Sequence, residues 1–314
     1  MIYTSICDMI GISYPIFQGG MAHIADGRLA AAVSQAGGLG IISAMNWDEN
    51  YLKEQIDLAR SLTDRPFGVN VMLMSPYTPQ VAQLLAEEKV PVVTTGAGNP
   101  SKYMPLWKEA GIHVIPVVAS VSMAKLMERS GAEAVIAEGG ESGGHVGDLT
   151  TMALVPQVCD AVSIPVIAAG GIGDGRGVAA AFMLGAQGVQ LGTRFLVAKE
   201  CSVHPTYKAK VLKATDLSTI VTGKRLGHPV RSLKSPFSRG YAKAEYSSMP
   251  DDELEQLAVG ALRLAAKEGD EKKGCFLAGQ IAGMVQKEQT CQEIITEIFE
   301  QAEMVLKGAE KWVK

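Results

Sequence analysis

The segments "PVIAAGG" (165–171) and "GVQLGT" (188–193) decide the fold. Each is a short apolar run without alternating polar residues, which is typical of a strand that is buried on both faces. A helical stretch joins the two runs, and it is closed by Gly185 just before the second run. Helices commonly end with a residue in the left-handed backbone conformation, and glycine adopts that conformation readily. The pair therefore predicts a strand, a helix and a second strand of one parallel sheet.

The same unit repeats along the first 200 residues. Six further runs have the same composition: "PIFQGG" (15–20), "LGIIS" (39–43), "FGVNVML" (67–73), "VPVVTTG" (90–96), "HVIPVVA" (113–119) and "EAVIAEG" (133–139). Eight strands with helices between them predict a (β/α)8 TIM barrel, an α/β fold, and a doubly wound open sheet is the alternative. Pro116 is placed near the end of its strand, because proline inside a paired strand loses a ladder hydrogen bond.

Composition and charge limit the class of protein. The chain has 314 residues, a net charge of −4 and no marked Lys/Arg cluster, so neither a nucleic acid nor a membrane surface is expected as a partner. The start "MIYTSICDMIG" lacks the basic and apolar regions of a signal peptide, and no apolar run is long enough for a membrane helix. The five cysteines are odd in number, widely spaced and without a C-x-x-C motif, which favours reduced thiols. We expect a soluble cytoplasmic protein.

The composition changes near residue 200 and predicts a second unit. Residues 1–203 are expected to form the barrel, and residues 204–285 a smaller, mainly helical cap that binds substrate. Ile294, Ile298 and Phe299 belong to an apolar stripe at helical spacing. A C-terminal helix at about 286–314 is therefore expected to return to the barrel wall and complete it.

The last two barrel strands end in glycines that predict a phosphate site. Gly170 and Gly171 follow one strand, and Gly192 and Thr193 follow the next. These turns place free backbone N–H groups at adjacent strand ends, where barrels commonly bind phosphate. The alternative is that the glycines only allow tight turns.

Asn70 is a polar residue within the apolar strand "FGVNVML". It shares the strand-end position with the glycines, which favours a hydrogen bond to the edge of a bound heterocycle. The alternative is a core amide with its hydrogen bonds satisfied inside the protein.

His145 lies in the glycine-rich loop "EGGESGGHVG" (138–147). An imidazole can donate or accept a proton near neutral pH, and the flanking glycines would let the loop fold over a ligand. The alternative is an ordinary surface histidine. His23 is a weaker candidate, His113 is expected to be structural, and the remaining histidines, His204 and His228, lie in the cap. No two histidines share helical spacing, so no metal site is predicted.

In order along the chain, the motifs "YPIFQGGMA", "AGGLGII", "PFGVNVMLMSP", "VVTTGAGNPSKYM", "GGHVG", "PVIAAGGI", "QLGTRF" and "AGQIAG" resemble one known family. They are similar to those of the flavin-dependent enoyl-acyl-carrier-protein reductases of type II, within the wider nitronate monooxygenase-like group of FMN barrels. The resemblance covers essentially the whole chain. It implies a TIM barrel with a cap, a tightly held FMN, and NADH or NADPH as reductant.

The resemblance also assigns residues. His145 matches the active-site histidine of the family. The FMN-contact positions are matched by Gly20, Met21, Ala22, Asn70, Glu138, Gly143, Gly144, Gly171, Gln190, Gly192 and Thr193, and Gln280 of "AGQIAG" closes the flavin site. Gly170 is added from the strand-end argument above.

The implied reaction is the reduction of a trans-2-enoyl thioester on acyl carrier protein, the last step of fatty-acid elongation. Hydride goes to the β-carbon, and His145 stabilises or protonates the resulting enolate.

One alternative is a nitronate monooxygenase, which shares the barrel, FMN and histidine but uses O₂ without nicotinamide. Glu138, where that branch usually has Gln, favours the reductase. Another alternative is a barrel isomerase or phosphate-binding protein without redox chemistry.

A homodimer and a monovalent-cation requirement are family expectations, and spacing identifies no ligands for the cation. The sequence contains no Rossmann fingerprint that would choose between NADH and NADPH. A carrier-protein contact would need a basic patch, for which "TGKRLGHPVRSLK" (222–234) is the candidate, with an ordinary solvated loop as the alternative.

Overall fold

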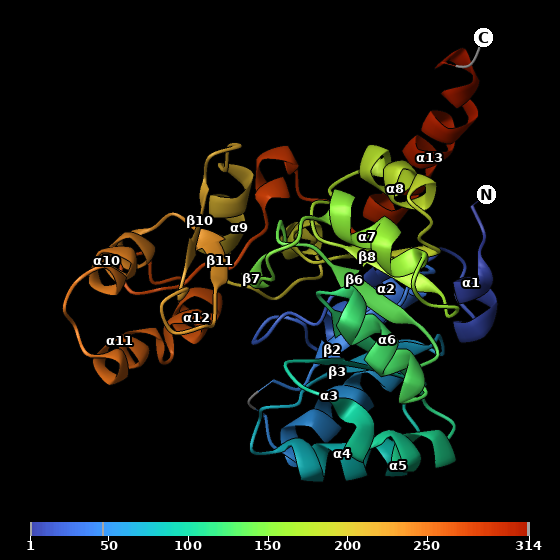
Figure 1. Ribbon diagram of the computed structural model, residues 1–314, viewed down its shortest axis with the longest axis horizontal. Coiled ribbons are helices and arrows are strands. Elements are labelled where there is room, and N and C mark those ends of the chain that lie inside the picture. Colours follow the sequence, from blue (N-terminus) through green and yellow to red (C-terminus); the bar gives the residue numbers. More distant parts are fainter. Residues whose placement is uncertain (1, 46, 313–314) are drawn as a thin grey trace.

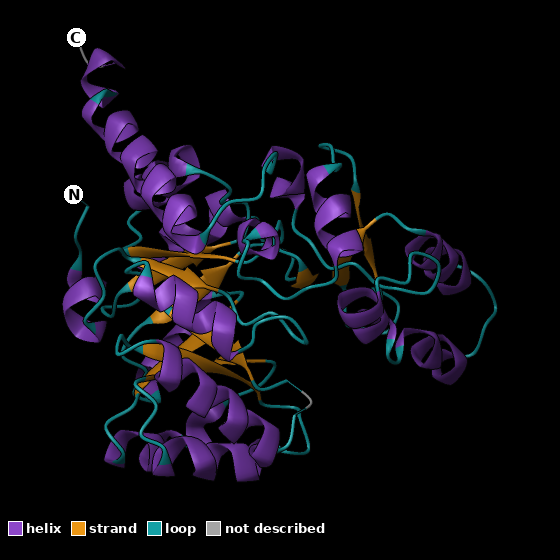
Figure 2. Ribbon diagram, turned by 180° about the vertical axis from the view of Figure 1, so that it is seen from behind, coloured by secondary structure: helices purple, strands orange, loops and turns teal. Residues whose placement is uncertain are grey.

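In the computed structural model, which describes residues 2–45 and 47–312, all eight apolar runs form strands of one barrel. The strands are parallel, in the order β1-β9-β8-β6-β5-β4-β3-β2, and a bridge between Phe17 and Leu39 joins the two ends of this order. The predicted TIM barrel is confirmed (Figures 1 and 2). The barrel strands are β1 Ile16–Gln18, β2 Gly40–Ser43, β3 Phe67–Met72, β4 Val92–Gly96, β5 His113–Val118, β6 Val135–Glu138, β8 Val166–Ala169 and β9 Gly188–Leu191.

Helices connect the strands and cover the outside of the barrel. Several begin at a side-chain cap, as where Asp174 accepts the N–H groups of Arg176 and Gly177. The glycines at 111, 131 and 185 all have positive φ angles after their helices. The barrel helices are α1 Ser5–Ile10, α2 Gly27–Gln35, α3 Glu49–Leu62, α4 Thr78–Glu87, α5 Met104–Glu109, α6 Val121–Arg129, α7 Thr151–Cys159 and α8 Gly175–Met183.

The barrel interior is a packed core. Side chains from several strands meet inside it and are fully buried, including Phe17, Ile41, Val92, Ile136 and Ile167. Helix α1 contributes to the same cluster, so it closes the end of the barrel where the strands begin. The opposite end, where the strands finish, is left for a site.

Pro116 is the fourth residue of β5, two residues before its end. The pairing of β5 changes at this point: it runs with β4 as far as Pro116 and with β6 from Val117 onward. The missing N–H of proline therefore falls where the ladder passes from one neighbour to the other.

The cap contains helices and also a small sheet that the sequence interpretation did not include. Its three strands are ordered β10-β11-β7, and they lie beside the barrel mouth in Figure 1. The cap elements are β7 Gly144–His145, α9 Pro205–Leu212, β10 Thr219–Thr222, β11 Val230–Leu233, α10 Pro236–Glu245, α11 Asp251–Ala258 and α12 Ala261–Arg263.

The last long helix, α13 (Cys291–Lys307), packs against α8 and α2 of the barrel. Ile294, Ile298 and Phe299 are on its buried face. Figure 2 shows α13 on the side of the barrel away from the cap, near the N-terminus. Residues 313–314, which the expected C-terminal segment includes, lie outside the described residues. Within the described ranges, no helix is both long and apolar enough to cross a membrane.

Candidate active site

The carboxyl ends of the barrel strands open toward the cap. Strand β6 ends at Glu138, and the chain then forms β7, which pairs with β11 of the cap. Figure 1 shows β7 and β11 between the barrel and the cap helices. The polar and glycine residues at the strand ends therefore face a space bounded by both parts of the molecule.

Gly20 and Asn70 lie in contact at one side of this mouth. A Cβ atom on Gly20 would be 2.3 Å from Cβ of Asn70, so only glycine allows this approach. The Thr94 hydroxyl donates to Oδ1 of Asn70 at 3.0 Å. Among the described residues the Asn70 side-chain nitrogen donates to no protein acceptor, which leaves a donor for the edge of a flat ring.

Met21 and Ala22 continue the turn after β1, and both are partly exposed. The Gln190 side chain of β9 lies against Gly19, where an added Cβ would be 3.4 Å from the carboxamide carbon. An added Cβ on Gly192 would lie 3.8 Å from the Met21 sulfur. The ends of β1 and β9 thus meet, as their parallel pairing requires.

The ends of β8 and β9 form a corner, here called the β8–β9 corner, made of residues 170–171 and 192–193. Gly170 and Gly171 have φ angles of 87° and 68°, which favour glycine. In the described part of the chain, no acceptor is recorded for the backbone N–H groups of Gly171, Gly192 and Thr193. The Thr193 hydroxyl accepts the Gly279 N–H at 2.8 Å, which joins the corner to the C-terminal segment. Three unpaired N–H donors at adjacent strand ends fit an anionic phosphate group.

The Glu141 carboxylate lies against this corner. An added Cβ on Gly171 would be 3.4 Å from its Oε1. The carboxylate accepts hydrogen bonds from the Thr151 N–H and hydroxyl, both at 2.9 Å. Since Thr151 begins α7, the helix N-terminus stabilises the charge of Glu141.

The glycines of the loop 138–147 are required by close packing. An added Cβ would be 2.1 Å from the Thr151 hydroxyl at Gly139, and 2.6 Å from the Ala278 carbonyl carbon at Gly143. The structure therefore gives these glycines a different role from the expected freedom to fold over a ligand. They let the loop approach α7 on one side and residues 278–279 on the other.

Glu138 lies at the start of this loop and is only partly exposed. Burial raises the pKa of its carboxyl to about 7, and a hydrogen bond from the Ser142 hydroxyl at 3.1 Å acts in the opposite direction. Glu138 can therefore be protonated or ionised near neutral pH.

His145 is on β7, the edge strand of the cap sheet, where it pairs with Val230. The residue as a whole is exposed to solvent, although its ring is partly buried. Burial of the ring lowers the pKa of His145, and the positive charge of His228 lowers it further. The imidazole is therefore neutral over most of the range near pH 7 and becomes a stronger acid when protonated.

Two cap residues complete the surroundings of His145. Arg231 donates to the Gly140 carbonyl oxygen through Nη2 at 2.9 Å and through Nε at 3.3 Å. His228 precedes Val230 by two residues, and Val146 donates its N–H to the Pro229 carbonyl at 3.0 Å. His228 thus lies just before β11, close enough to His145 for its charge to act on the ring.

The sequence interpretation missed Arg231, His228 and Glu141. No local pattern marks Arg231 or His228, because they act through a pairing between segments far apart in the chain. The signal that could have found them is the basic stretch "HPVR" (228–231), once β7 is known to pair with it.

Gln280 lies next to the loop, with an exposed side chain. Its N–H donates to the Glu141 carbonyl at 2.9 Å, so its backbone holds the loop. Gly144 is held in the same region by its backbone pairing with Arg231, and it has a φ angle of 85°.

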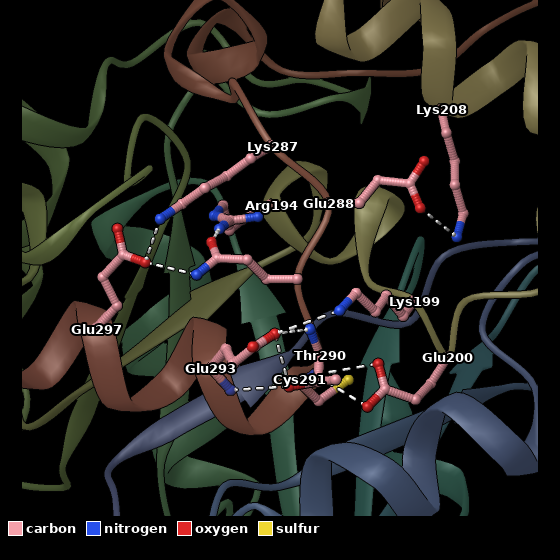
Figure 3. A network of polar contacts seen from close by, with 11 residues as sticks. Arg194, Lys199, Glu200, Lys208, Lys287, Glu288, Thr290, Cys291, Glu293 and Glu297 are labelled. Atoms are coloured by element: carbon pink, nitrogen blue, oxygen red, sulfur yellow. Dashed lines mark hydrogen bonds and ion pairs between the residues drawn. The ribbon is translucent and has the colours of Figure 1, made fainter.

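A polar network behind the β8–β9 corner fixes the segment that leads from Gln280 back to the barrel (Figure 3). Arg194 donates to Gln289, whose side chain donates to Glu297 of α13 at 2.5 Å. Thr290 and Glu293 form a capping box at the start of α13. The corner is therefore supported on its far side by the barrel and by α13.

The other histidines lie elsewhere. His23 has a φ angle of 60°, a buried Nδ1 without a hydrogen-bond partner among the described residues, and a pKa lowered first by burial. His113 contacts Glu133 at 2.6 Å, and His204 accepts the Thr206 N–H at the start of α9. Within the described ranges, no group of three or more His, Cys, Asp or Glu residues could hold a metal ion.

Comparisons with known proteins agree on one group. A family model described as nitronate monooxygenase matches residues 4–83 and 75–301. The solved structure of FabK from Thermotoga maritima has 48% sequence identity and a TM-score of 0.98, covering 100% of both chains. An indene-carboxyl-CoA dehydrogenase of Rhodococcus jostii RHA1 is 34% identical over 95% of each chain. A probable nitronate monooxygenase of Staphylococcus aureus MSSA476 is 33% identical and covers 88% of this chain and 90% of its own.

Proposed function

The chain belongs to the nitronate monooxygenase family, an oxidoreductase group, and we propose that within it the protein is an FMN-dependent enoyl-acyl-carrier-protein reductase. It would reduce trans-2-enoyl thioesters to saturated thioesters with NADH or NADPH. Acyl carrier protein would deliver the substrate.

The observation that carries this proposal is the similarity to FabK, an enoyl-acyl-carrier-protein reductase of type II. It extends over both entire chains at 48% identity, whereas the CoA dehydrogenase and the nitronate monooxygenase reach 34% and 33%. The CoA dehydrogenase relative also supports a thioester as the class of substrate, because its name specifies a carboxyl-CoA compound.

The strand ends offer donors that fit FMN. The unpaired N–H groups of Gly171, Gly192 and Thr193 would hold its phosphate, and Gly20 and Asn70 would lie at its ring. The other proposed contacts are Met21, Ala22, Glu138, Gly143, Gly144, Gly170, Gln190 and Gln280. When bound, FMN supplies hydride transfer between the nicotinamide and the β-carbon of the enoyl thioester.

His145 is the proposed proton donor. Addition of hydride to the β-carbon leaves an enolate, whose oxygen needs a hydrogen-bond donor and whose α-carbon needs a proton. Because its pKa lies below the ordinary value, protonated His145 gives up its proton readily. The neutral ring still offers one N–H to the thioester oxygen.

Glu138 supports the reductase over the monooxygenase assignment. Gln is usual at this position in the monooxygenase branch, and a carboxyl with a pKa near 7 can carry a proton that a carboxamide cannot release.

The test is an anaerobic half-reaction. Purified protein is loaded with FMN, NADH or NADPH is added until the flavin absorbance bleaches, and a trans-2-enoyl thioester is then mixed in. We expect the absorbance to return with an equimolar yield of saturated thioester. If the nicotinamide leaves the absorbance unchanged and a nitronate bleaches it, the protein is a monooxygenase. Protein that binds no FMN would instead support the alternative without redox chemistry.

A further inference from the structure

The cap carries a basic pocket on the side of its sheet that α9 and α10 bound. Its cavity has a volume of about 450 Å³ and lies between α9, the connection to β10, the end of β11 and α10. From this pocket we infer that the cap has a docking site for an acidic helix of the carrier protein that delivers the substrate. The inference rests on the proposed function, because it concerns how that substrate arrives.

The charge of the pocket is the first argument. Lys210, Lys213, Lys234 and Arg239 line it together with one carboxylate, Glu271. Lys210 is paired with Glu271 at 2.8 Å. Among the described residues, no ion pair or side-chain hydrogen bond is recorded for the other three cations, and all three are exposed. Lys213 also interacts electrostatically with Glu271, so the four cations and the one carboxylate leave an excess of three positive charges, which attracts an anionic partner.

The second argument is an exposed leucine at the same place. Leu217 lines the pocket and is 73% exposed, so its side chain is available to an apolar group of a partner. Ala209, Ala214 and Leu233 add apolar surface beside it. A free phosphate would use the charges but would gain nothing from Leu217. An amphipathic acidic helix would use both, because it can place an apolar side chain on the leucine and carboxylates around it.

The third argument is that much of the neighbouring positive charge is already engaged. Within the basic stretch 222–234, Arg225 donates to carbonyl oxygens of Ser247 and Met249 and pairs with Asp251. Arg231 holds Gly140 in the loop of His145. Lys234 is the basic residue of this stretch that lines the pocket, and the proposed site combines it with residues of α9 and α10.

The position of the pocket suits delivery to His145. Strand β11 begins at Val230, which pairs with His145, and Lys234 follows its last residue. At about 3.3 Å per residue, four residues separate the two points by roughly 13 Å along the strand. A flexible thioester-bearing arm can bridge this separation while the carrier remains docked on the cap.

The experiment compares one enoyl chain on three thiols: acyl carrier protein, coenzyme A and N-acetylcysteamine. The variants are Lys213→Glu, Lys234→Glu, Arg239→Glu and the triple variant. Lys224→Glu, an exposed cap lysine outside the pocket, and Lys125→Glu, on the barrel, are the matched controls. Binding of fluorescently labelled carrier protein is measured in parallel, so the test does not depend on turnover.

We expect each reversal in the pocket to lower kcat/KM for the carrier-linked substrate by roughly tenfold, mainly through KM, and to weaken carrier binding equally. The loss should shrink at high salt. The N-acetylcysteamine substrate should react as with the wild type, which also shows that the variants fold. Leu217→Ser should weaken carrier binding without changing its salt dependence.

Four results would overturn the inference. Unchanged carrier binding in the triple variant would exclude the pocket, and an equal loss with Lys224→Glu would place docking at the 222–229 turn. A parallel loss with the coenzyme A substrate would assign the pocket to phosphate groups. Wild-type protein that reduces the N-acetylcysteamine substrate but binds no carrier would exclude docking altogether. Failure of the proposed function looks different, because no thioester would then be reduced whatever the carrier binding.

Discussion

The β8–β9 corner and the loop of His145 both border the barrel mouth, but they are built in different ways. The corner is made of barrel strand ends, and Gly279 and the network around α13 support it from behind. The loop is shared: Gly139 packs against α7 of the barrel, while β7 pairs with β11 of the cap. The difference suggests a division of labour, in which the corner holds the phosphate of the proposed cofactor and the shared loop determines how the substrate meets its proton donor.

The largest expected effect is that of substituting His145, which should change the reaction at the loop and leave the β8–β9 corner unaffected. His145→Ala should slow reduction of the enoyl thioester by about 10²–10⁴-fold, because the enolate loses its acid. Bleaching of the flavin by the nicotinamide should be unchanged, since the β8–β9 corner is untouched. Stopped-flow measurement of the two half-reactions checks this, with His113→Ala as a control outside the site. Equal slowing of both half-reactions would contradict the division of labour.

Glu138 gives a prediction about stability and pH. Its folded pKa of about 7 lies above the ordinary value of 4.5, so between these values the folded state binds a proton that the unfolded chain has lost. The stability of the wild type therefore falls as pH rises from about 4.5 to 7. Glu138→Gln removes this penalty and should raise the free energy of unfolding by about 3 kcal/mol at pH 8, with no difference at pH 4.

Urea denaturation of the cofactor-free protein at the two pH values measures the effect. Glu109→Gln, at the exposed end of α5, is the matched control for the loss of a carboxylate. An equal gain in the free energy of unfolding at both pH values would mean that burial does not raise the pKa of the Glu138 carboxyl.

The barrel could be predicted from the sequence because its strands are buried on both faces, so "PVIAAGG" and "GVQLGT" carry their own signal. The pairing of β7 with β11 could not, since the two residues Gly144 and His145 show no periodicity and their partners are far along the chain. The glycine loop was recognised as special, but its composition does not distinguish flexibility from close packing. That distinction at Gly143 required the position of Ala278.

Substitution of Arg231 tests whether the cap positions the loop that carries His145. Arg231→Met keeps most of the side-chain volume but removes the hydrogen bonds to the Gly140 carbonyl. We expect kcat/KM for the enoyl thioester to fall by roughly tenfold, the equivalent of one charged hydrogen bond of about 1.5 kcal/mol. The affinity for FMN should change much less, because the N–H groups proposed to hold its phosphate belong to the β8–β9 corner. Arg231→Lys, which can restore one bond, should recover part of the activity, and a loss of FMN affinity in both variants would show that the loop and the corner are coupled.

The smallest expected effect concerns the pH dependence of His145. Burial is the larger cause of its lowered pKa and the charge of His228 the smaller, so His228→Ala should raise the pKa without returning it to the ordinary value. Because the protonated ring is the acid, the fall of kcat/KM with rising pH should begin at a higher pH in the variant. The rate at low pH should be unchanged, since both proteins are then protonated at His145. His204→Ala is the matched control, because this cap histidine caps α9. A profile that stays in place would mean that His228 is too far from His145 to act on it, and the cap would then position the acid without tuning it.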